Sequence, residues 1–486
     1  MQRIRLFTLI LAGAVVLCAD GLRPGQTQST GLRRITNTTE EAININPSIS
    51  GDGRIVAFES TEDLAAAGGT DHFRAIRANV GADPPTFSQM GGTRAVSPAV
   101  SQDGSRIAFA SRDDPLGTNP DGNSEIFLYD GTRLTQVTNT SPGSLGNRTT
   151  NGNFQPSISD DGRFIAFSSN RDFSAQNIDG NFEIFVFDSL ATSFAQITNS
   201  SGIVGFTDAK ISGNGNFVVY IRDNGATPGT SRDLIEQTRL GGDVTVLASG
   251  VPSLALTYGR AISDDGTRVV YAGQTAPNTT QVFLYDGRGA AGIRQITSLG
   301  ARVTEVPLHP SISGDGSRIS FATRRNVNGG NTDGSVELYL YDLPTATFSK
   351  ITNAPAIAAT DVVSSLNDDG STAIGHFYKF YDPCDCSNIF YIRNSRIFYI
   401  TVFLRHYPDQ FVSLISIINS LNALIPTNSY RKYYPWKKYR ISKRNYWQFI
   451  RNISPIAGFT ITFVQWNYWY KIHFIFRSQK KIRIFH

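Results

Sequence analysis

Three loops in the sequence carry oxygen-bearing side chains at alternate positions around a central glycine, an arrangement that suits a hard cation such as calcium. They read Asn-x-Asp-Gly-(Asn/Ser)-x-Glu. The spacing falls short of an EF-hand, which needs a longer loop and a bidentate glutamate further on. A hairpin turn, in which Asp-Gly bends the chain and Glu begins the next strand, explains the same residues. The candidate calcium ligands are Asn119, Asp121, Asn123, Glu125, Asn177, Asp179, Asn181, Glu183, Asn331, Asp333 and Glu337.

The remaining candidate groups do not form a catalytic set. The six histidines are scattered, and the sequence holds neither a Gly-x-Ser-x-Gly elbow nor a phosphate-binding loop. His309 opens a predicted strand and is interpreted as a packing or rim residue. Four arginines that follow similar strands could line a rim for carboxylate ligands or pair with aspartates of their own loops; they are Arg112, Arg171, Arg222 and Arg324. We predict no catalytic residue and, calcium apart, no cofactor.

The elements that position these loops come from a repeat. Ser-x-Asp-Gly, or a close variant, recurs seven times with 50 to 58 residues between successive glycines. Asp-Gly tolerates the positive φ angles of a tight hairpin turn, and a residue present in nearly every repeat is structural rather than catalytic. The predicted turn residues are Asp52, Gly53, Asp103, Gly104, Asp161, Gly162, Asp265, Gly266, Asp315, Gly316, Asp369 and Gly370, with Asn214 in place of aspartate in the fourth copy.

Each repeat contains short alternating apolar runs that predict four antiparallel strands. In the third copy the runs are 156–159, 164–169, 183–188 and 194–198. A period near 50 residues built of short strands is typical of a β-propeller with one blade per repeat. We therefore predict an all-β, seven-bladed propeller of four-stranded antiparallel blades. Residues 32–37 match a fourth strand with no repeat before them, and we expect them to close the last blade, which would remove a free sheet edge.

The string Pro-Ser-Ile-Ser-x-Asp-Gly-x-x-Ile-Ala-Phe resembles the WD40-like (PD40) repeats of TolB-type propellers, over residues 32–375. This resemblance implies a role in bridging proteins of the periplasm. TolB-type proteins carry an α/β domain before the propeller, and this chain has no room for one. Similar repeats also occur in the propellers of prolyl peptidases, where they gate a hydrolase domain that is not visible here.

The first residues indicate export. Arg3 and Arg5 precede an apolar run that is too short for a typical transmembrane helix and ends in small residues, as in a secretory signal. We divide the chain into a signal peptide (1–19), a leader (20–31), the propeller (32–394) and a C-terminal tail (395–486). The expected location is the periplasm or the exterior, with no transmembrane helix in the mature chain. A lipid anchor on Cys18 is the weaker alternative, because Leu17 is large for the preceding position.

Charge separates the tail from the rest. Residues 387–486 carry 16 Lys and Arg and one acid, so residues 1–386 have a net charge of −10. An acidic ring argues against nucleic acid as the propeller's partner. The tail is basic, aromatic and almost free of glycine. It is either frameshifted or inserted sequence, a real domain for an anionic partner, or a membrane segment.

Together these features predict a monomeric binding scaffold for a protein or polysaccharide ligand in the cell envelope, since rigid rings with variable loops suit such surfaces. An envelope polysaccharide lyase or hydrolase built on a propeller is the alternative. A truncated or frameshifted product without a selected function is the third.

Overall fold

The computed structural model describes most of the propeller and several strands of the C-terminal region. The described residues are 27–38, 42–66, 72–141, 152–173, 175–202, 204–224, 231–288, 292–302, 307–354, 362–378, 387–405, 437–440, 447–451, 459–466 and 469–477. They form β-strands, turns and irregular segments, and no helix lies among them. This part of the chain accordingly contains no helix with the length and hydropathy needed to cross a membrane. The predicted signal peptide and Cys18 lie outside the described residues.

The chain divides into two units. One is Leu32–Arg393, and the other comprises Met1–Gly31 and Asn394–His486. In the second unit the strands β28 (Lys437–Arg440), β29 (Trp447–Arg451), β30 (Phe459–Trp466) and β31 (Trp469–Arg477) form antiparallel neighbours in the order β31-β30-β29-β28. The origin proposed for the tail remains a prediction.

The third repeat shows how the sequence makes a blade. Its strands are β10 (Asn153–Ile158), β11 (Phe164–Ser169), β12 (Glu183–Asp188) and β13 (Ser193–Gln196), paired in chain order. Every residue of β11 is buried, because neighbouring blades cover both faces of this strand. Phe167 lies opposite Phe185, with the ring centroids 6.0 Å apart. The burial thus falls on the Ile-Ala-Phe run that the repeat predicts to be a strand.

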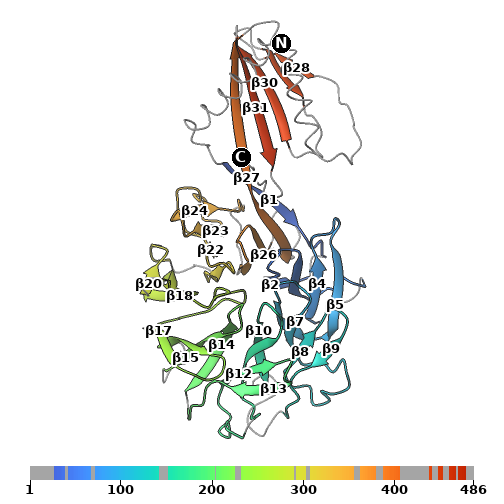
Figure 1. Cartoon of the computed structure of the whole chain (residues 1–486), viewed down its shortest axis with the longest axis vertical. Coiled ribbons are helices and arrows are strands. Elements are labelled where there is room, and N and C mark those ends of the chain that lie inside the picture. The colour runs from blue at the N-terminus through green and yellow to red at the C-terminus, as the bar shows by residue number, and fades with distance from the viewer. Residues whose placement is uncertain are drawn as a thin grey trace, which may run out of the picture. The chain divides into compact units, whose positions relative to one another are not determined.

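The structure has six blades, which are arranged around a common centre that we call the channel (Figure 1). The fifth blade has three strands, and two isolated bridges, Ala255↔Ala272 and Ile262↔Val269, take the place of its innermost strand. The other strands are β2 (Asn44–Ile49), β3 (Ile55–Ser60), β4 (Arg74–Asn79) and β5 (Thr86–Thr93); β6 (Ala95–Val100), β7 (Ile107–Ser111), β8 (Glu125–Tyr129) and β9 (Leu134–Gln136); β14 (Gly205–Ile211), β15 (Phe217–Asp223), β16 (Arg232–Thr238) and β17 (Val244–Val251); β18 (Arg268–Ala276), β19 (Thr279–Asp286) and β20 (Gly292–Gln295); β21 (Ser311–Ile312), β22 (Arg318–Thr323), β23 (Glu337–Asp342) and β24 (Thr347–Lys350).

The prediction of a seventh four-stranded blade is wrong. The seventh repeat supplies the inner strands β25 (Ser364–Leu366) and β26 (Thr372–Tyr378), but β26 pairs with β27 (Ser387–Arg405), which runs on past the end of the propeller unit. The other repeats end their third strand at a turn, often through an aspartate such as Asp188. Residues 387–405 contain neither aspartate nor glycine, so no Asp turn of this kind ends the third strand, and β27 continues instead of folding back.

The seventh repeat nevertheless completes the ring. β25 contacts both β21 of the sixth blade and β2 of the first. At the N-terminus, β1 (Thr27–Arg34) pairs with β27. Ile35, which follows β1, is buried in one cluster with Ile374 of β26. The chain ends of the propeller unit therefore meet in the seventh repeat.

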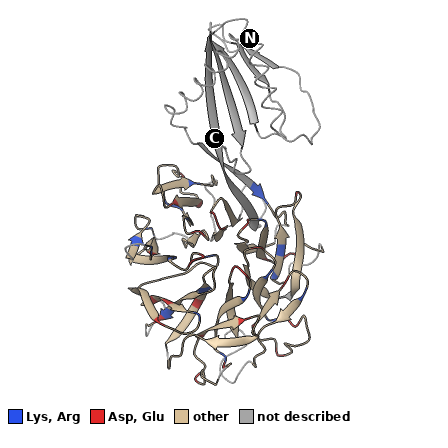
Figure 2. Ribbon diagram, in the orientation of Figure 1, with Lys and Arg blue, Asp and Glu red and all other residues tan. Residues whose placement is uncertain are grey.

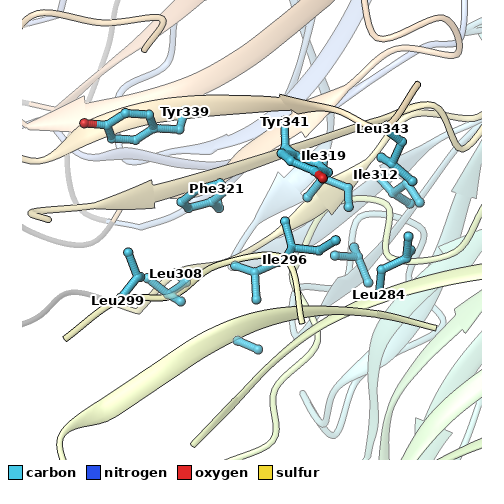
Figure 3. Close-up of a cluster of buried hydrophobic side chains, with 13 residues drawn as sticks. Leu284, Ile296, Leu299, Leu308, Ile312, Ile319, Phe321, Tyr339, Tyr341 and Leu343 are labelled. Carbon is cyan, nitrogen blue, oxygen red and sulfur yellow. The ribbon is translucent and has the colours of Figure 1, made fainter. Parts of the chain in front are cut away.

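The hydrophobic core lies between successive blades rather than within one layer. Between the fifth and sixth blades, Leu284 lies in one buried cluster with Ile319, Phe321 and Tyr339 (Figure 3). The rings of Phe321 and Tyr339 stack with centroids 5.8 Å apart. Acidic and basic residues are interspersed over the blades, so charge is not segregated to one sector (Figure 2). This packing holds the inner strands rigidly around the channel.

Candidate binding site in the central channel

The inner strand of most repeats carries a bulge at one fixed position, seven residues before the turn glycine. Four described bulges lie in β2, β6, β10 and β14. The residue at this position has a positive φ in five repeats: Asn46 (50°), Ser97 (55°), Gln155 (52°), Asp208 (57°) and His309 (39°). Bulges re-aim the side chains that follow them. In these four strands the residue two positions after the positive-φ residue lines the same cavity, namely Ser48, Ala99, Ser157 and Lys210.

The Ser-x-Asp-Gly turns close one end of the channel. Gly51 N donates to Gln102 O, Gln102 N to Asp160 O, and Asp160 N to Gly213 O, at 2.8–2.9 Å. In the next turns Asn214 N donates to Asp264 O, Asp264 N to Gly314 O and Asp315 N to Asp368 O, each at 2.8 Å. The series closes when Asp368 N donates to Gly51 O at 3.1 Å. Seven backbone hydrogen bonds thus join all seven turns in a closed ring. We call this ring the channel floor; its members are the x residues Gly51, Gln102, Asp160, Gly213, Asp264, Gly314 and Asp368.

Around the floor, aspartates and glycines alternate for a steric reason. A Cβ on Gly213 would collide with the carboxylates of Asp160 and Asp264, and one on Gly51 would collide with Asp368. Each aspartate side chain therefore lies over a neighbouring glycine. Seven positions cannot alternate throughout, and Gln102 occupies the one that is neither aspartate nor glycine. It donates its amide N–H to Asp368 Oδ2 at 2.8 Å.

Arg260 binds the three floor aspartates. Its guanidinium lies 3.0 Å from Asp368 Oδ1 and 3.7 Å from Asp160 Oδ1, and it donates a short hydrogen bond to Asp264 Oδ1. The residue occupies a position that is proline in four of the other six repeats, namely Pro47, Pro98, Pro156 and Pro310. Burial raises the pKa of Asp264 to about 7; Arg260 opposes the shift, and the nearby carboxylates of Asp160 and Asp368 add to it. One arginine thus joins the third, fifth and seventh repeats across the channel.

Above the floor lies a cavity of about 50 Å³. Its wall includes the hydroxyl-bearing Ser48, Ser157 and Ser365, the buried Lys210, and Tyr258. Tyr258 is 43% exposed, and its ring centroid lies 6.3 Å from that of His309. The cavity therefore combines an exposed tyrosine, a polar wall and a charged floor, and it is the candidate binding site.

The predicted turn residues lie in the turns that form the floor. In the third repeat, Ser159 Oγ donates to Asp161 Oδ1 at 2.6 Å, and the same oxygen accepts from Arg163 N at 2.9 Å. The turn glycines all have a positive φ, from 61° at Gly370 to 78° at Gly266. Asn214 makes the same bonds in the fourth repeat, since Ser212 Oγ donates to Asn214 Oδ1 at 2.7 Å. The aspartate is therefore used as a local acceptor, which an asparagine oxygen can replace.

The candidate calcium loops direct their glutamates into the blade. Both carboxylate oxygens of Glu125 already accept hydrogen bonds, from Thr138 Oγ1, Thr140 N and Oγ1, and Asn153 Nδ2. In the third blade Glu183 accepts from Ser200 N and Oγ, and in the sixth Glu337 accepts from Thr352 Oγ1 and Ala354 N. This geometry ties the start of the third strand to the end of the fourth.

The rest of these loops is engaged in similar internal contacts. Asn119 and Asn177 donate through Nδ2 to the backbone of their own loops. Their Oδ1 atoms, and those of Asn123 and Asn181, are buried without a hydrogen-bond partner among the described residues. Asp179 Oδ2 accepts from Gly202 N at 3.2 Å, Asp333 Oδ1 accepts from Ser335, and Asp121 is partly exposed. The described part of the chain holds no cluster of three or more His, Cys, Asp or Glu able to bind a metal. These internal contacts agree with the hairpin interpretation, and calcium binding stays the untested alternative.

Sequence reasoning missed Arg260, Lys210 and the alternating floor. The signal was available in the register of the repeats, because a proline position holds Arg260 and a serine or alanine position holds Lys210. Among the four arginines, Arg222 pairs with Asp233 at 2.5 Å rather than with an aspartate of its own loop, and Arg171 donates to Ser141 O.

Comparison with known proteins finds similarity to solved structures alone. No protein-family model matches the chain, and no curated protein sequence matches it. Solved structures similar to it include TolB from Acinetobacter baumannii (19% identity, 62% of this chain, 63% of that chain, TM-score 0.39). A second similar structure is the propeller domain of the Trilobed protease from Pyrococcus furiosus (14% identity, 73% of this chain, 94% of that chain, TM-score 0.47). A third is oligogalacturonate lyase from Vibrio parahaemolyticus (12% identity, 76% of this chain, 97% of that chain, TM-score 0.49). The chain is a β-propeller with TolB among its structural neighbours.

Proposed function

We propose that this protein is an exported, TolB-like propeller that acts as a binding scaffold for a protein or polymer ligand of the cell envelope. The observation that carries the proposal is the asymmetry of the channel. Seven backbone hydrogen bonds and the Arg260 cluster close the floor, whereas Tyr258 is exposed at the other side of the cavity. A ligand therefore enters from the side of Tyr258.

The mouth residues suit recognition of a macromolecular surface. A tyrosine offers a rigid apolar ring with a polar tip, and such residues are enriched in the centres of interfaces. His309 lies beside Tyr258 and itself has a positive φ of 39° just before the inner strand β21. The scaffold proposal thus rests on a pre-formed site that requires little ordering on binding.

A lyase or hydrolase acting on an envelope polysaccharide is the second candidate. It is favoured by one observation: Tyr258, His309, Arg260 and Lys210 come from the fourth, fifth and sixth repeats to the same channel. Such a set could bind an acidic sugar and move a proton.

Affinity capture with the full chain, followed by cross-linking and mass spectrometry, tests the scaffold proposal. We expect one dominant envelope partner whose cross-links map to the side of Tyr258. With the purified partner, Tyr258→Ala should weaken binding about tenfold or more, since a central tyrosine is often worth over 1.4 kcal/mol. Leu190→Ala is the matched control, because Leu190 is 75% exposed in the turn after β12, at the floor end of its blade.

Equal effects of the two substitutions would refute binding at the channel mouth. Turnover of an acidic polysaccharide that disappears in His309→Ala would instead establish the enzyme alternative.

A further inference from the structure

Lys210 is an exception in a ring of small residues. It lies two positions after the bulge of β14, where the other repeats place serine or alanine. The equivalent residues are Ser48, Ala99, Ser157, Ala261, Ser311 and Ser365. The fourth repeat therefore places one long cationic side chain into the wall of the channel cavity.

The ammonium group of Lys210 is buried with few partners. The residue is 7% exposed, and Nζ donates to Tyr258 O at 3.3 Å. An ammonium has three donors, and among the residues that the structure describes no ion pair forms with Lys210. A buried charge without an ionic partner is costly, so the site favours a group that would supply one.

Two hydroxyl groups of the same wall add further donors. Ser48 Oγ accepts from Val100 N at 3.3 Å, and Ser157 Oγ accepts from Ile211 N at 3.1 Å. Within the described residues, neither hydroxyl hydrogen has an acceptor, so each can donate into the cavity. The wall thus offers donors from Lys210, Ser48 and Ser157 to whatever occupies it.

The charged neighbours permit this role. Asp208 lies near Lys210 but contacts Thr207, and Asp160 and Arg260, which line the cavity, are paired with one another at 3.7 Å. Burial lowers the pKa of Lys210 to about 8, and Asp208 opposes the shift, so the amine is still mostly protonated at pH 7. Asp160, Asp264 and Asp368 share the single Arg260 at the floor, so the positive part of the cavity is the wall at Lys210, whose amine stays mostly protonated under neutral conditions.

We propose that the channel cavity binds a carboxylate group, held by Lys210 Nζ and the hydroxyls of Ser48 and Ser157. A carboxylate only accepts hydrogen bonds, which matches a wall of donors. A volume of about 50 Å³ is enough for such a group. The carboxylate comes either from a small free acid or from the macromolecular ligand; in the second case the inference deepens the proposed function and rests on it.

Thermal unfolding of the full chain at pH 6.5 tests the site. Sodium acetate is the probe, and acetamide is its neutral isostere. Sodium chloride keeps the ionic strength constant. Acetate should raise Tm saturably by about 2 °C or more, and acetamide should not. Lys210→Met should abolish the rise. Lys350→Met is the control. Lys350 pairs with Glu337 and lies outside the cavity, so acetate should still raise the Tm of this variant.

A second readout does not depend on the stability of the lysine variant. In protein labelled with ¹³C at lysine Cε, an NMR titration should show that acetate raises the apparent pKa of Lys210. The double variant Ser48→Ala/Ser157→Ala should bind acetate about tenfold more weakly. Equal responses to acetate and acetamide, or a response that survives Lys210→Met, would overturn the carboxylate site. If the purified partner binds Lys210→Met as tightly as the parent chain, the ligand does not supply the carboxylate, while the scaffold proposal stands.

Discussion

Arg260 and Asp368, from the fifth and seventh repeats, form an ion pair across the channel with Nη2 and Oδ1 3.0 Å apart. The same guanidinium reaches Asp160 of the third repeat and Asp264 of its own turn. Ring closure therefore does not depend on the seventh repeat forming a four-stranded blade. Its turn is tied to the other repeats by this ion pair and by backbone hydrogen bonds to the first and sixth turns.

Arg260→Met should destabilise the propeller by about 3 kcal/mol or more at pH 8, since it leaves three carboxylates without their cation. The loss should be smaller at pH 5, where Asp264 binds a proton. Urea unfolding at both pH values measures it. Arg163→Met is the control, because the pair of Arg163 with Asp188 is partly exposed and its loss should destabilise the propeller clearly less. Similar losses for both variants would contradict the central role of Arg260.

Gly213→Ala should cost about 1–3 kcal/mol, because the added Cβ would collide with Asp160 and lie 2.7 Å from Asp264 Oδ1. Gly292→Ala serves as the comparison. Gly292 has open space around it and lies in β20, so its replacement should change stability by about 0.5 kcal/mol or less. A neutral Gly213→Ala variant would show that the floor can widen. Chemical denaturation of the two variants provides the measurement.

Stability should fall as pH rises from about 4 to 7. Burial raises the pKa of Asp264, Glu59 and Glu236 to about 7, so the folded state binds more protons than the unfolded chain across this window, and the contribution is lost as pH passes through the folded pKa. Below pH 4 the pH dependence of stability reverses, and stability falls as pH falls. The hydrogen bond from Arg163 lowers the pKa of Asp188 to about 2, so the unfolded chain binds more protons there than the folded state.

Unfolding free energies measured from pH 3 to pH 8 should therefore peak near pH 4–5. Asp264→Asn should flatten the neutral side of this curve. Asp265→Asn should not, since hydrogen bonds from Ser263, Thr267 and Arg288 outweigh burial and lower the pKa of Asp265. A flat profile in the parent chain would contradict the assignment.

Glu125→Ala should destabilise the second blade by about 2–3 kcal/mol, because the donors of Thr138, Thr140 and Asn153 lose their acceptor. Glu125→Gln should cost less. The fifth blade makes this exchange naturally: Gln281 Oε1 accepts from Thr297 Oγ1 at 2.8 Å and from Leu299 N at 2.9 Å. Thermal unfolding ranks the variants, and equal losses would show that the charge, not the acceptor, is required.

Millimolar calcium should leave Tm unchanged, because calcium would have to displace the hydrogen bonds that the carboxylate of Glu125 already accepts. Magnesium at the same concentration controls for ionic strength. A rise in Tm specific to calcium, lost in Asp121→Asn or Asp179→Asn, would establish the cation site that the loop composition predicts.

The repeat, its strands and its turns could be predicted from the sequence alone, because these depend on local properties. An Asp-Gly pair sets a bend whatever surrounds it, and Ile-Ala-Phe is apolar on both faces, so it predicts a strand buried on both sides, as Phe167 in β11 is. The number of blades was decided by the segment after the inner strands of the seventh repeat. Without a turn after its third strand, β27 continues and no separate blade forms.

The site was decided by tertiary structure. Arg260, Asp160 and Asp368 come together because ring closure brings distant turns within hydrogen-bond distance, and no local pattern encodes that approach. Lys210 is one lysine in a strand until the ring buries it beside Ser48 and Ser157 of other repeats. Local sequence therefore determines the blade, whereas the chemistry of the channel arises from long-range contacts between residues that differ from the repeat.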